Sequence, residues 1–574
     1  MKQRLLIALL LFPLAFAGSG GSALAQPQAY EVQSLRKLSA DEAQVVVLLN
    51  QSAAMRDGGR LDEAVTVADQ ALALARKTRF RDLEATVLLH IGILADQRSM
   101  PVQALQALRR SLLLCELEGN LVCQANARMV VAQVQGRTGE ADEAGRQREF
   151  SRTLAAAAGD RKGLLNADVA QLASHAGTAD DKRSRADAVL AQSRAAGSPV
   201  DEALALRSQG RDALEAGDLD RAQSLFDEAL ARSRAAVNVR AEADSLVALV
   251  ELAMARRRFK EAADLAVRAV AAARTSRDQG TVGNALTRSA SVHIFSGDAV
   301  AARDTALLAL AAYLADGQAL GQGLAHATIG DAEWMAGRRT EAEAHFRDAI
   351  RLAVTAGDVA NEASARLRLA SLLRAVDPAA AMAQADRAGA LYGRITHKSG
   401  TAATLLEQAQ IHGAANDMGS AIDKASRGRA LYQEIRRPDK VARADFLLSV
   451  AYQAKGRPDE AAAAVGRSVA GYRALAMPAE EAEALLYQAD MLGRRGDLQA
   501  ADAGLGRGQE IAARNTVILS RILLGRSVLH EALGRRDSAV AFADQAMVVA
   551  RSTGRADAVE AARKRQASLG KGER

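Results

Sequence analysis

The feature that most constrains this chain is a phrase that recurs every 38 to 40 residues along almost its whole length. The phrase is a turn, usually with a glycine, followed by an acidic residue and an alanine, as in residues 59–64, 337–342 and 456–461. We call its last residue the reference residue. The thirteen reference residues are Ala64, Ala104, Ala144, Ser184, Ala222, Ala262, Ala302, Ala342, Ala381, Ala421, Ala461, Ala501 and Ala539. Self-similarity at this period is typical of chains built from one repeated supersecondary unit.

Other positions test this register. The residue seven places after each reference residue is Ala, Ser or Gly in all thirteen repeats, and the residue twelve places before it is mostly small, with Leu172, Val250 and Leu369 as exceptions. Five places before it, glycine or Asn416 recurs, which suits a left-handed helix end. Each unit is therefore expected to be two helices whose small residues allow close packing.

These offsets resemble the tetratricopeptide repeat, in the forty-residue variant of MalT-like and kinesin-light-chain-like proteins. The resemblance covers residues 45–560 and implies an all-α fold, a right-handed α-solenoid of about thirteen helical hairpins. The unit around Ser184, within residues 165–200, is degenerate, and a polar tail is expected at residues 561–574. Because such repeats serve many pathways, the resemblance is specific for fold and weak for function.

The N-terminus has the pattern of a secretory signal. Two basic residues are followed by an apolar run at residues 5–17 and by small residues up to Ala25, and residues 26–44 form a linker. A membrane anchor is the alternative, but the run contains Pro13 and is shorter than the roughly 20 residues that span a bilayer. We expect an exported protein, periplasmic or secreted, of bacterial origin.

Charge argues against a nucleic-acid partner. Without residues 1–25, 73 basic residues face 68 acidic ones, and the two signs are interspersed. The one compact basic cluster is residues 563–565, which a solvated helix face explains. No later apolar stretch is long enough to cross a membrane. The sequence does not indicate an oligomeric state.

Cys115 and Cys123 are the only cysteines, and they flank the turn at residues 118–120. In an oxidising compartment a disulfide would close this turn. Two buried free thiols are the alternative, since cysteine is often buried.

Catalytic and metal signatures are missing from the sequence. His175, His293, His412 and His530 share one helix position, but about three repeats separate each from the next, so they cannot meet at one ion. The glycines follow the turn period, and no nucleophile-elbow, phosphate-loop or zinc-protease motif occurs. We expect no enzymatic activity and no cofactor.

The tetratricopeptide resemblance implies that the first helix of each unit lines a concave groove, at eighteen, fifteen, eleven and eight places before the reference residue. Asp244 occupies the first of these positions. The candidate partner-binding residues are Asn284, Ser291, Asp331, Trp334, Arg366 and Gln410. Amides suit a peptide backbone, and charged side chains suit charged partners. Trp334, the only tryptophan, either anchors a ligand or covers a gap between hairpins.

Three functions compete on this evidence. The leading hypothesis is an exported scaffold or adaptor that holds a protein or peptide partner in the groove without catalysis. The alternative is a sensory or regulatory module that acts on a separate signalling or effector protein. An enzyme with a helical superstructure would need a compact catalytic domain, for which the repeats leave no room.

Overall fold

The structure is a computed structural model that describes residues 8–9, 32–33 and 38–570, except 58–59, 79, 99, 138–139, 174–178, 277, 316–317, 357, 514 and 554–555. These residues form 27 α-helices and two short antiparallel strands, β1 (Ala8–Leu9) and β2 (Val32–Gln33). The expected signal, residues 1–25, lies outside the described residues except for Ala8 and Leu9.

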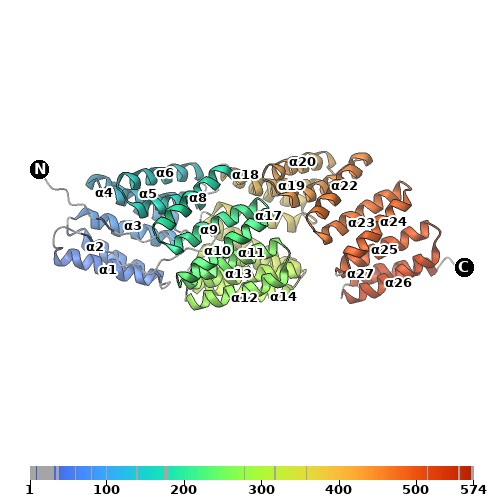
Figure 1. The fold of residues 1–574 in the computed structure, drawn as a ribbon, viewed down its shortest axis with the longest axis horizontal. Helices are drawn as coiled ribbons and strands as arrows, with labels where there is room; N and C mark the ends of the chain where they lie inside the picture. The colour runs from blue at the N-terminus through green and yellow to red at the C-terminus, as the bar shows by residue number, and fades with distance from the viewer. Residues whose placement is uncertain are drawn as a thin grey trace. The chain divides into compact units, whose positions relative to one another are not determined.

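Odd-numbered helices are the first helices of their hairpins and even-numbered helices are the second (Figure 1). The first helices are α1 (Ala40–Asp57), α3 (Arg81–Gln97), α5 (Leu121–Arg137), α7 (Arg161–Ala173), α9 (Pro199–Glu215), α11 (Val239–Ala255), α13 (Gln279–Ser296), α15 (Ala319–Met335), α17 (Val359–Leu373), α19 (Lys398–Ala414), α21 (Pro438–Ala454), α23 (Pro478–Arg494) and α25 (Thr516–Ala532). The second helices are α2 (Leu61–Ala75), α4 (Pro101–Glu118), α6 (Ala141–Ala157), α8 (Ala179–Ala195), α10 (Leu219–Ala235), α12 (Phe259–Ser276), α14 (Ala299–Ala315), α16 (Arg339–Ala356), α18 (Pro378–Arg394), α20 (Met418–Glu434), α22 (Pro458–Ala474), α24 (Leu498–Ile511) and α26 (Arg536–Ser552). A final helix, α27 (Ala556–Gly570), follows them.

The chain divides into two units, the first made of residues 1–373 and 383–400 and the second of residues 374–382 and 401–574. In each unit, first and second helices pack as hairpins, and successive hairpins stack on one another. The prediction of an all-α chain of about thirteen stacked hairpins is therefore confirmed.

The recurring small residues form the interior of the stack. Every predicted reference residue whose side chain is described is at most 2% exposed. In two repeats a serine lies seven places later and uses the close approach: the hydroxyls of Ser111 and Ser151 donate to the carbonyl oxygens of Ala85 and Ala125 on the preceding first helices, at 2.7 Å in both cases. The helices there lie close enough for a short side chain of one to reach the backbone of the other.

Within a hairpin, side-chain sizes on the two helices are complementary. Where a first helix has glycine twelve places before the reference residue, the second helix has a large residue four places after it. Phe226 packs on Gly210 and Phe346 packs on Gly330, so closely that an added Cβ would lie 2.3 Å and 2.6 Å from the respective rings. Glycine is required at these positions because the phenyl ring occupies the space of its missing side chain.

The same complementarity explains two exceptions in the sequence pattern. Val250 and Leu369, large where other repeats are small, are both buried, and the residues at the matching second-helix position are Ala266 and Ala385. In these hairpins the large side chain therefore lies on one helix or on the other, whereas hairpins such as that of Ala290 and Ala306 have small residues at both positions.

The register of the fourth repeat is where the sequence prediction is wrong. We expected Ser184 as the reference residue, with Ala191 seven places later, yet Ala191 is exposed. Instead Ala186 is 1% exposed and Ser193, seven places after it, is 0% exposed. The chain is rich in alanine here, so two registers offset by two residues both present small side chains at the required places. The burial of Ala186 and Ser193, together with the exposure of Ala191, favours the second register.

Most of the described turns between paired helices reach left-handed backbone geometry five places before the reference residue, as the glycine pattern predicted, and Val376 is an exception. Gly337 has φ 78° and Asn416 has φ 62°. Arg257 occupies the same place in the sixth repeat with φ 59°. A non-glycine residue in this region costs about 1 kcal/mol or more, because its Cβ approaches the following carbonyl oxygen.

The first helix begins inside the expected linker of residues 26–44. The backbone N–H of Ser39 donates to Glu42 at 2.8 Å, and the backbone N–H of Glu42 donates to the Ser39 hydroxyl at 3.2 Å. This reciprocal capping box satisfies two N–H groups that a helix start leaves unpaired, and so it starts α1 at Ala40.

The C-terminus also differs from the expected polar tail at residues 561–574. Helix α27 extends to Gly570 and buries Ala562 and Leu569. Arg565 donates through Nε to the Ser527 hydroxyl and through Nη2 to the Ser527 carbonyl oxygen, both at 2.8 Å. Helix α27 thus packs on the thirteenth hairpin in the manner of a first helix.

A disulfide joins Cys115 at the end of α4 to Cys123 in α5, and the two Cα atoms lie 5.6 Å apart. The backbone N–H of Cys123 also donates to the Asn120 side chain at 3.0 Å. The turn between the second and third hairpins is therefore closed both covalently and by a cap.

Closing so short a loop is expected to stabilise the folded chain by about 2 to 3 kcal/mol on the chain-entropy estimate. Reduction should lower the denaturant midpoint accordingly, while leaving a Cys115→Ala/Cys123→Ala variant unaffected. Thiol labelling of the denatured, unreduced protein should find no free cysteine. Two labelled thiols would contradict the bridge.

Arginines from successive second helices hold acidic residues on the first helix between them. Glu481 on α23 is 3% exposed and accepts hydrogen bonds from Arg473 of α22 at 2.9 Å and Arg507 of α24 at 2.8 Å. Burial alone would raise the pKa of Glu481, but the hydrogen bonds from Arg507 and Arg473 outweigh it and hold the pKa below the usual 4.5.

The hydrogen bonds of the two arginines to Glu481 predict a pH dependence of stability. Because the folded pKa of Glu481 is depressed, its contribution is complete above about pH 4.5 and is lost as the pH falls through the folded value. We expect the denaturant midpoint of the wild type to fall more steeply below pH 4.5 than that of Glu481→Gln. Glu483→Gln, on the same helix but half-exposed, is the control and should follow the wild type. Parallel pH curves for wild type and Glu481→Gln would contradict the prediction.

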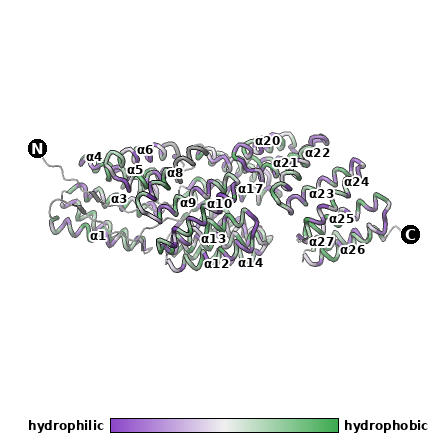
Figure 2. Tube along the Cα trace, in the orientation of Figure 1, coloured by the Kyte–Doolittle hydropathy of each residue, from purple (hydrophilic) through white to green (hydrophobic). Residues whose placement is uncertain are grey.

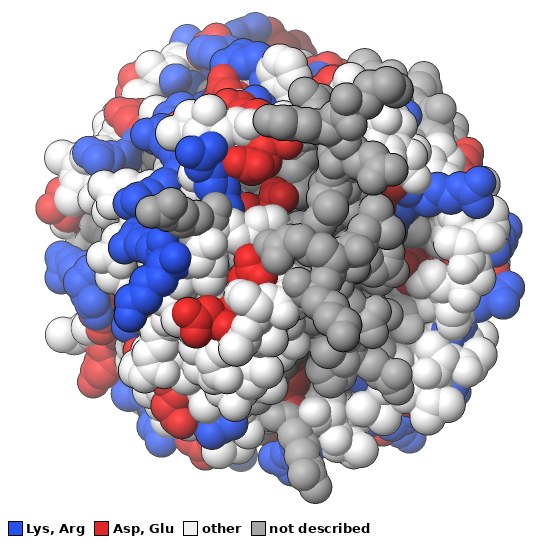
Figure 3. All heavy atoms as spheres, turned by 90° about the vertical axis from the view of Figure 1, so that its left-hand side faces the viewer, with Lys and Arg blue, Asp and Glu red and all other residues white. Residues whose placement is uncertain are grey.

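Figure 2 shows hydrophobic and hydrophilic residues mixed along the helices, and Figure 3 shows both signs of charge interspersed over one face. Among the described residues, no helix combines the length and the apolar character needed to span a bilayer.

Candidate functional site: the Trp334 surface

Five of the six predicted partner-binding residues lie in the first unit, and Gln410 lies in the second. Two of the five are already engaged with the protein itself. Arg368 of α17 donates to both carboxylate oxygens of Asp331 at 2.9 and 3.1 Å, and the charge of Asp331 raises the pKa of Arg368. Arg366 donates to Glu362 at 2.7 Å and to Gln384 at 2.9 Å. Their charges tie neighbouring helices together.

Of the three uncharged polar candidates, two form hydrogen bonds within their own helices. The Ser291 hydroxyl donates to the Thr287 carbonyl oxygen at 3.0 Å, within its own helix. The Gln410 amide does the same with Leu406 at 3.4 Å. Asn284 is half-buried and has no hydrogen-bond partner among the described residues, so its amide remains available to a ligand.

Asp244, also predicted to line the groove, is instead in the interior. It is 5% exposed, and its carboxylate lies 3.6 Å from Nη2 of Arg207, which is 3% exposed. Burial raises the pKa of Asp244, and the positive charge of Arg207 offsets part of that rise. The position eighteen places before this reference residue therefore faces the neighbouring repeat, which the pattern of polar residues did not reveal.

Trp334 is the candidate that faces solvent. It is 41% exposed, near the end of α15, and Met335 beside it is 38% exposed. Together with Ile294 of α13 and Asp331 they line a pocket of about 300 Å³. Apolar side chains make nearly all of this pocket, with the Asp331 carboxylate, already paired to Arg368, at its polar edge. The sequence left two roles open for Trp334, an anchor for a ligand or a cover over a gap between hairpins. Its exposure beside a pocket favours the anchor.

Sequence reasoning missed a pair of stacked aromatic residues, one of which is next in sequence to the pocket-lining Ile294. Phe295 follows Ile294 and is 61% exposed, and its ring stacks on Phe259 of α12 with centroids 6.3 Å apart and planes 12° apart. Only 3% of the residues are aromatic, so three exposed or stacked rings within three successive repeats are a signal that a scan for rare residues would have found. We call Phe259, Ile294, Phe295, Trp334 and Met335 the Trp334 surface.

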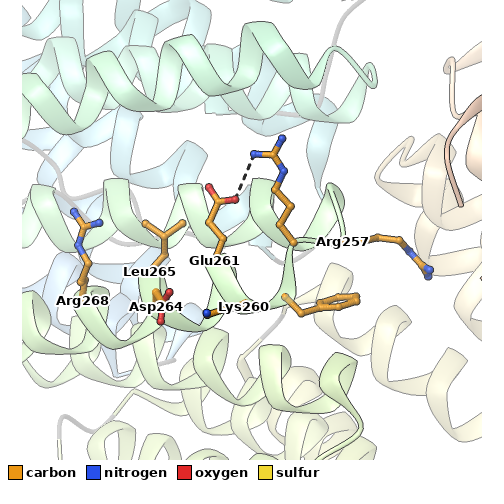
Figure 4. Close-up of a pocket in the computed structure, with 8 residues that line it drawn as sticks. Arg257, Lys260, Glu261, Asp264, Leu265 and Arg268 are labelled. Atoms are coloured by element: carbon orange, nitrogen blue, oxygen red, sulfur yellow. Dashed lines mark hydrogen bonds and ion pairs between the residues drawn. The ribbon is translucent and has the colours of Figure 1, made fainter. Parts of the chain in front are cut away.

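A second pocket, of about 790 Å³, lies along the first turns of α12 and includes Phe259 in its lining (Figure 4). Four basic and two acidic side chains line it with Phe259 and Leu265. They are Arg257, Arg258, Lys260, Arg268, Glu261 and Asp264. Arg258 and Glu261 form an ion pair at 3.4 Å, drawn as a dashed line in Figure 4. One end of the Trp334 surface therefore has a net positive surrounding.

Within the described part of the chain, no group of three or more His, Cys, Asp or Glu side chains is arranged to hold a metal ion. The nearest approach of two histidines is the Nδ1 pair of His326 and His345, 3.0 Å apart between α15 and α16. Burial lowers the pKa of His326, and so does the nearby His345. A hydrogen bond between the two ring nitrogens accounts for this contact. His175 lies outside the described residues.

The stacked hairpins define an all-α helical-repeat protein. No family model matches the sequence, and no curated protein matches it. Solved structures with a similar arrangement include a Rap protein complexed with Competence and Sporulation Factor, with 12% identity, TM-score 0.39, and 58% of this chain and 98% of that chain covered.

Two further structures are comparable. BtubC (BKLC) from P. vanneervenii has 16% identity and a TM-score of 0.33, with 38% of this chain and 92% of that chain covered. The apo form of RapI has 12% identity and a TM-score of 0.38, with 47% of this chain and 98% of that chain covered. Likeness at this level is general among stacked helices and assigns no ligand.

Proposed function

We propose that this protein is exported and acts, without catalysis, as a tetratricopeptide-type scaffold or adaptor that holds a protein or peptide partner at the Trp334 surface. The observation that carries the proposal is the 41% exposure of the only tryptophan over an apolar pocket of about 300 Å³. Tryptophan is among the residues most often found at the energetic centre of interfaces, because it buries a large area with little loss of side-chain freedom.

The composition of the surface supports a peptide-like partner. A partner that inserts an aliphatic or aromatic side chain between Ile294 and Trp334 would exclude water from both. Phe295, stacked on Phe259, would continue the contact into the preceding repeat. The half-buried amide of Asn284, one of the predicted binding residues, lies on the same helix α13 as Ile294, where it is suited to a backbone group of the partner.

Export is supported by the pattern of residues 1–25 and by the use of cysteine. The only two cysteines are bridged, which is typical of proteins that fold in an oxidising compartment. The mature chain would start near Gln26. Fusion of residues 1–25 to a reporter that is active only outside the cytoplasm would test this part of the proposal, and an inactive reporter would contradict it.

The binding site is tested with a photo-crosslinking amino acid at Met335 in the full mature chain. We expect a discrete adduct with a protein or peptide of the same compartment. We expect none with the same label at Leu113, which is more exposed than Met335, at 56% against 38%, but lies on α4. Trp334→Ala should weaken binding of the identified partner about 30-fold, as the loss of roughly 2 kcal/mol implies. Leu113→Ala is the matched control. Unchanged affinity of Trp334→Ala would show that the site is wrong.

The alternative, a regulatory module, would use the same surface on a different kind of partner. A signalling or effector protein in the adduct would favour the regulatory role, and a structural or substrate protein would favour the scaffold. The identity of the adduct therefore distinguishes the two.

A further inference from the structure

Helix α14 differs from the other second helices in the side chains it presents to solvent. Arg303 and Asp304, which pair with each other at 3.2 Å, are its only charged residues. Leu307, Leu308 and Leu314 are 42%, 55% and 59% exposed. They lie at helical spacing, so they form one apolar stripe along the outer side of the helix.

The equivalent positions in most other repeats are charged. Five and six places after the reference residue, where α14 has Leu307 and Leu308, the other second helices mostly have charged residues. These are Asp69, Arg109, Arg110, Glu149, Asp227, Glu228, Arg268, Arg347, Asp348, Asp386, Arg387, Arg427, Arg467, Arg507 and Asp544. The leucines of α14 therefore replace charged surface residues of the other repeats. The packing of the repeat does not require leucine at these positions.

Apolar residues on the adjacent second helices extend the stripe. Val267 of α12 occupies the position of Leu307 one repeat earlier and is 69% exposed. Val354 of α16 occupies the position of Leu314 one repeat later and is 52% exposed. Helices α12 and α14 both pack on α13, and α14 and α16 both pack on α15. We call Val267, Leu307, Leu308, Leu314 and Val354 the α14 surface.

The charges beside this surface are asymmetric. On α12, Arg268 and Arg274 are exposed and have no ion-pair partner among the described residues. On α16, Arg347 pairs with Glu343 at 2.6 Å and Arg351 pairs with Asp348 at 2.9 Å. Asp264, also exposed on α12, offsets one of these two charges, so the α12 edge of the α14 surface is net positive by one, whereas the α16 edge is balanced.

We propose that the α14 surface docks an amphipathic helix of another protein, whose apolar face covers the leucine stripe and whose acidic edge meets Arg268 and Arg274. A leucine stripe flanked by a second helix is the kind of surface that receives a helix through anchors at i, i+3, i+4 and i+7. The unpaired arginines give the interaction its orientation and its dependence on salt.

Neither a second copy of this chain nor a membrane fits the charges as well. If two copies paired through α14 about a two-fold axis, the arginines of α12 in one copy would face those of α12 or of α16 in the other. The α16 arginines are accessible for this, because Arg347 and Arg351 are 66% and 65% exposed. An anionic bilayer would also contact exposed carboxylates, because Asp304 lies within the stripe and is 58% exposed.

The experiment selects from a displayed library of single-helix peptides on the full mature chain, with the Leu308→Asp variant as counter-selection. The bound peptides should have apolar residues at helical spacing and Asp or Glu along one edge. Measured by fluorescence anisotropy, their affinity should fall at least tenfold for Leu308→Asp and for Arg268→Glu/Arg274→Glu, about 1.4 kcal/mol. Leu113→Asp, equally exposed on α4, is the matched control and should bind as the wild type does.

The charge-reversed variant provides a second readout. Arg268→Glu/Arg274→Glu should now bind versions of the same peptides in which the acidic edge is replaced by lysine. Circular dichroism of each variant confirms that it is folded, as expected for exposed positions.

Several results would overturn the proposal. These are selected helices without an acidic edge, binding that Leu308→Asp leaves unchanged, a wild-type dimer that Leu308→Asp dissociates, or sedimentation with phosphatidylglycerol vesicles that Leu308→Asp abolishes. The Trp334→Ala variant should bind the selected peptides normally, so failure here is distinguishable from failure at the Trp334 surface.

Discussion

Replacing Phe346 by alanine is expected to lower the free energy of unfolding of the surrounding repeats by about 3 to 5 kcal/mol. The ring is fully buried and fills the space above Gly330, where an added Cβ would lie 2.6 Å from it. Because each repeat contacts only its neighbours, the loss should be local. Hydrogen exchange should show faster opening of α15 and α16 and little change in the distant hairpins.

Phe295→Ala is the matched control, because that ring is 61% exposed and its loss should cost less than about 0.5 kcal/mol. The opposite change, Gly330→Ala, should destabilise by about 1 to 3 kcal/mol through overlap with the ring. Combining Gly330→Leu with Phe346→Ala should recover part of the loss, since it moves the large side chain to the other helix as Val250 and Ala266 do. A Phe346→Ala chain as stable as the wild type would refute the packing argument.

Asp244→Ala is expected to cost about 3 to 5 kcal/mol, because it leaves the Arg207 guanidinium buried without its counter-charge. Arg207 is 3% exposed, and its other contacts are long: Nη1 lies 3.4 Å from both the Ala241 carbonyl oxygen and the Ser245 hydroxyl. These neutral groups replace a carboxylate poorly in a region of low dielectric constant. Chemical denaturation of the full chain measures the effect.

The double variant separates the charge from the packing. Arg207→Met with Asp244→Leu replaces the pair by apolar side chains of similar size and should be close to the wild type in stability. Asp201→Ala, on the same helix as Arg207 but hydrogen-bonded to Ser198 at its start, should cost only about 1 kcal/mol. A double variant as unstable as Asp244→Ala would show that the ion pair is a net stabilising interaction.

The repeat could be predicted from sequence because close helix packing leaves few choices of side chain. An alanine at Ala342 or Ala461 excludes larger residues by contact, so the constraint recurs at every turn of the stack and is visible as a period. The same argument fails around Ser184. There Ala186 and Ser193 offer a second set of small residues, and only their burial in the structure, together with the exposure of Ala191, distinguishes the two registers.

The binding site could be predicted from the sequence less well than the repeat. Asp331, Arg366 and Trp334 were selected for position and polarity. In the structure Asp331 pairs with Arg368 of the neighbouring first helix, Arg366 pairs with Glu362 of its own helix, and Trp334 is exposed. A side chain's position along a helix fixes the direction in which it points. It does not fix whether a neighbouring repeat already supplies its partner.

By itself, then, the sequence determined the architecture of this protein: helices in pairs, a unit of about forty residues, and turns at glycine. These features follow from local backbone geometry and from helix contacts that recur in every repeat. The same residue types are therefore needed at the same positions of each repeat. The tertiary structure alone decided that Arg207 meets Asp244, that Phe295 lies on Phe259, and that the leucines of α14 have no cover among the described residues. Those outcomes depend on which side chains of different repeats come face to face, and no single repeat contains that information.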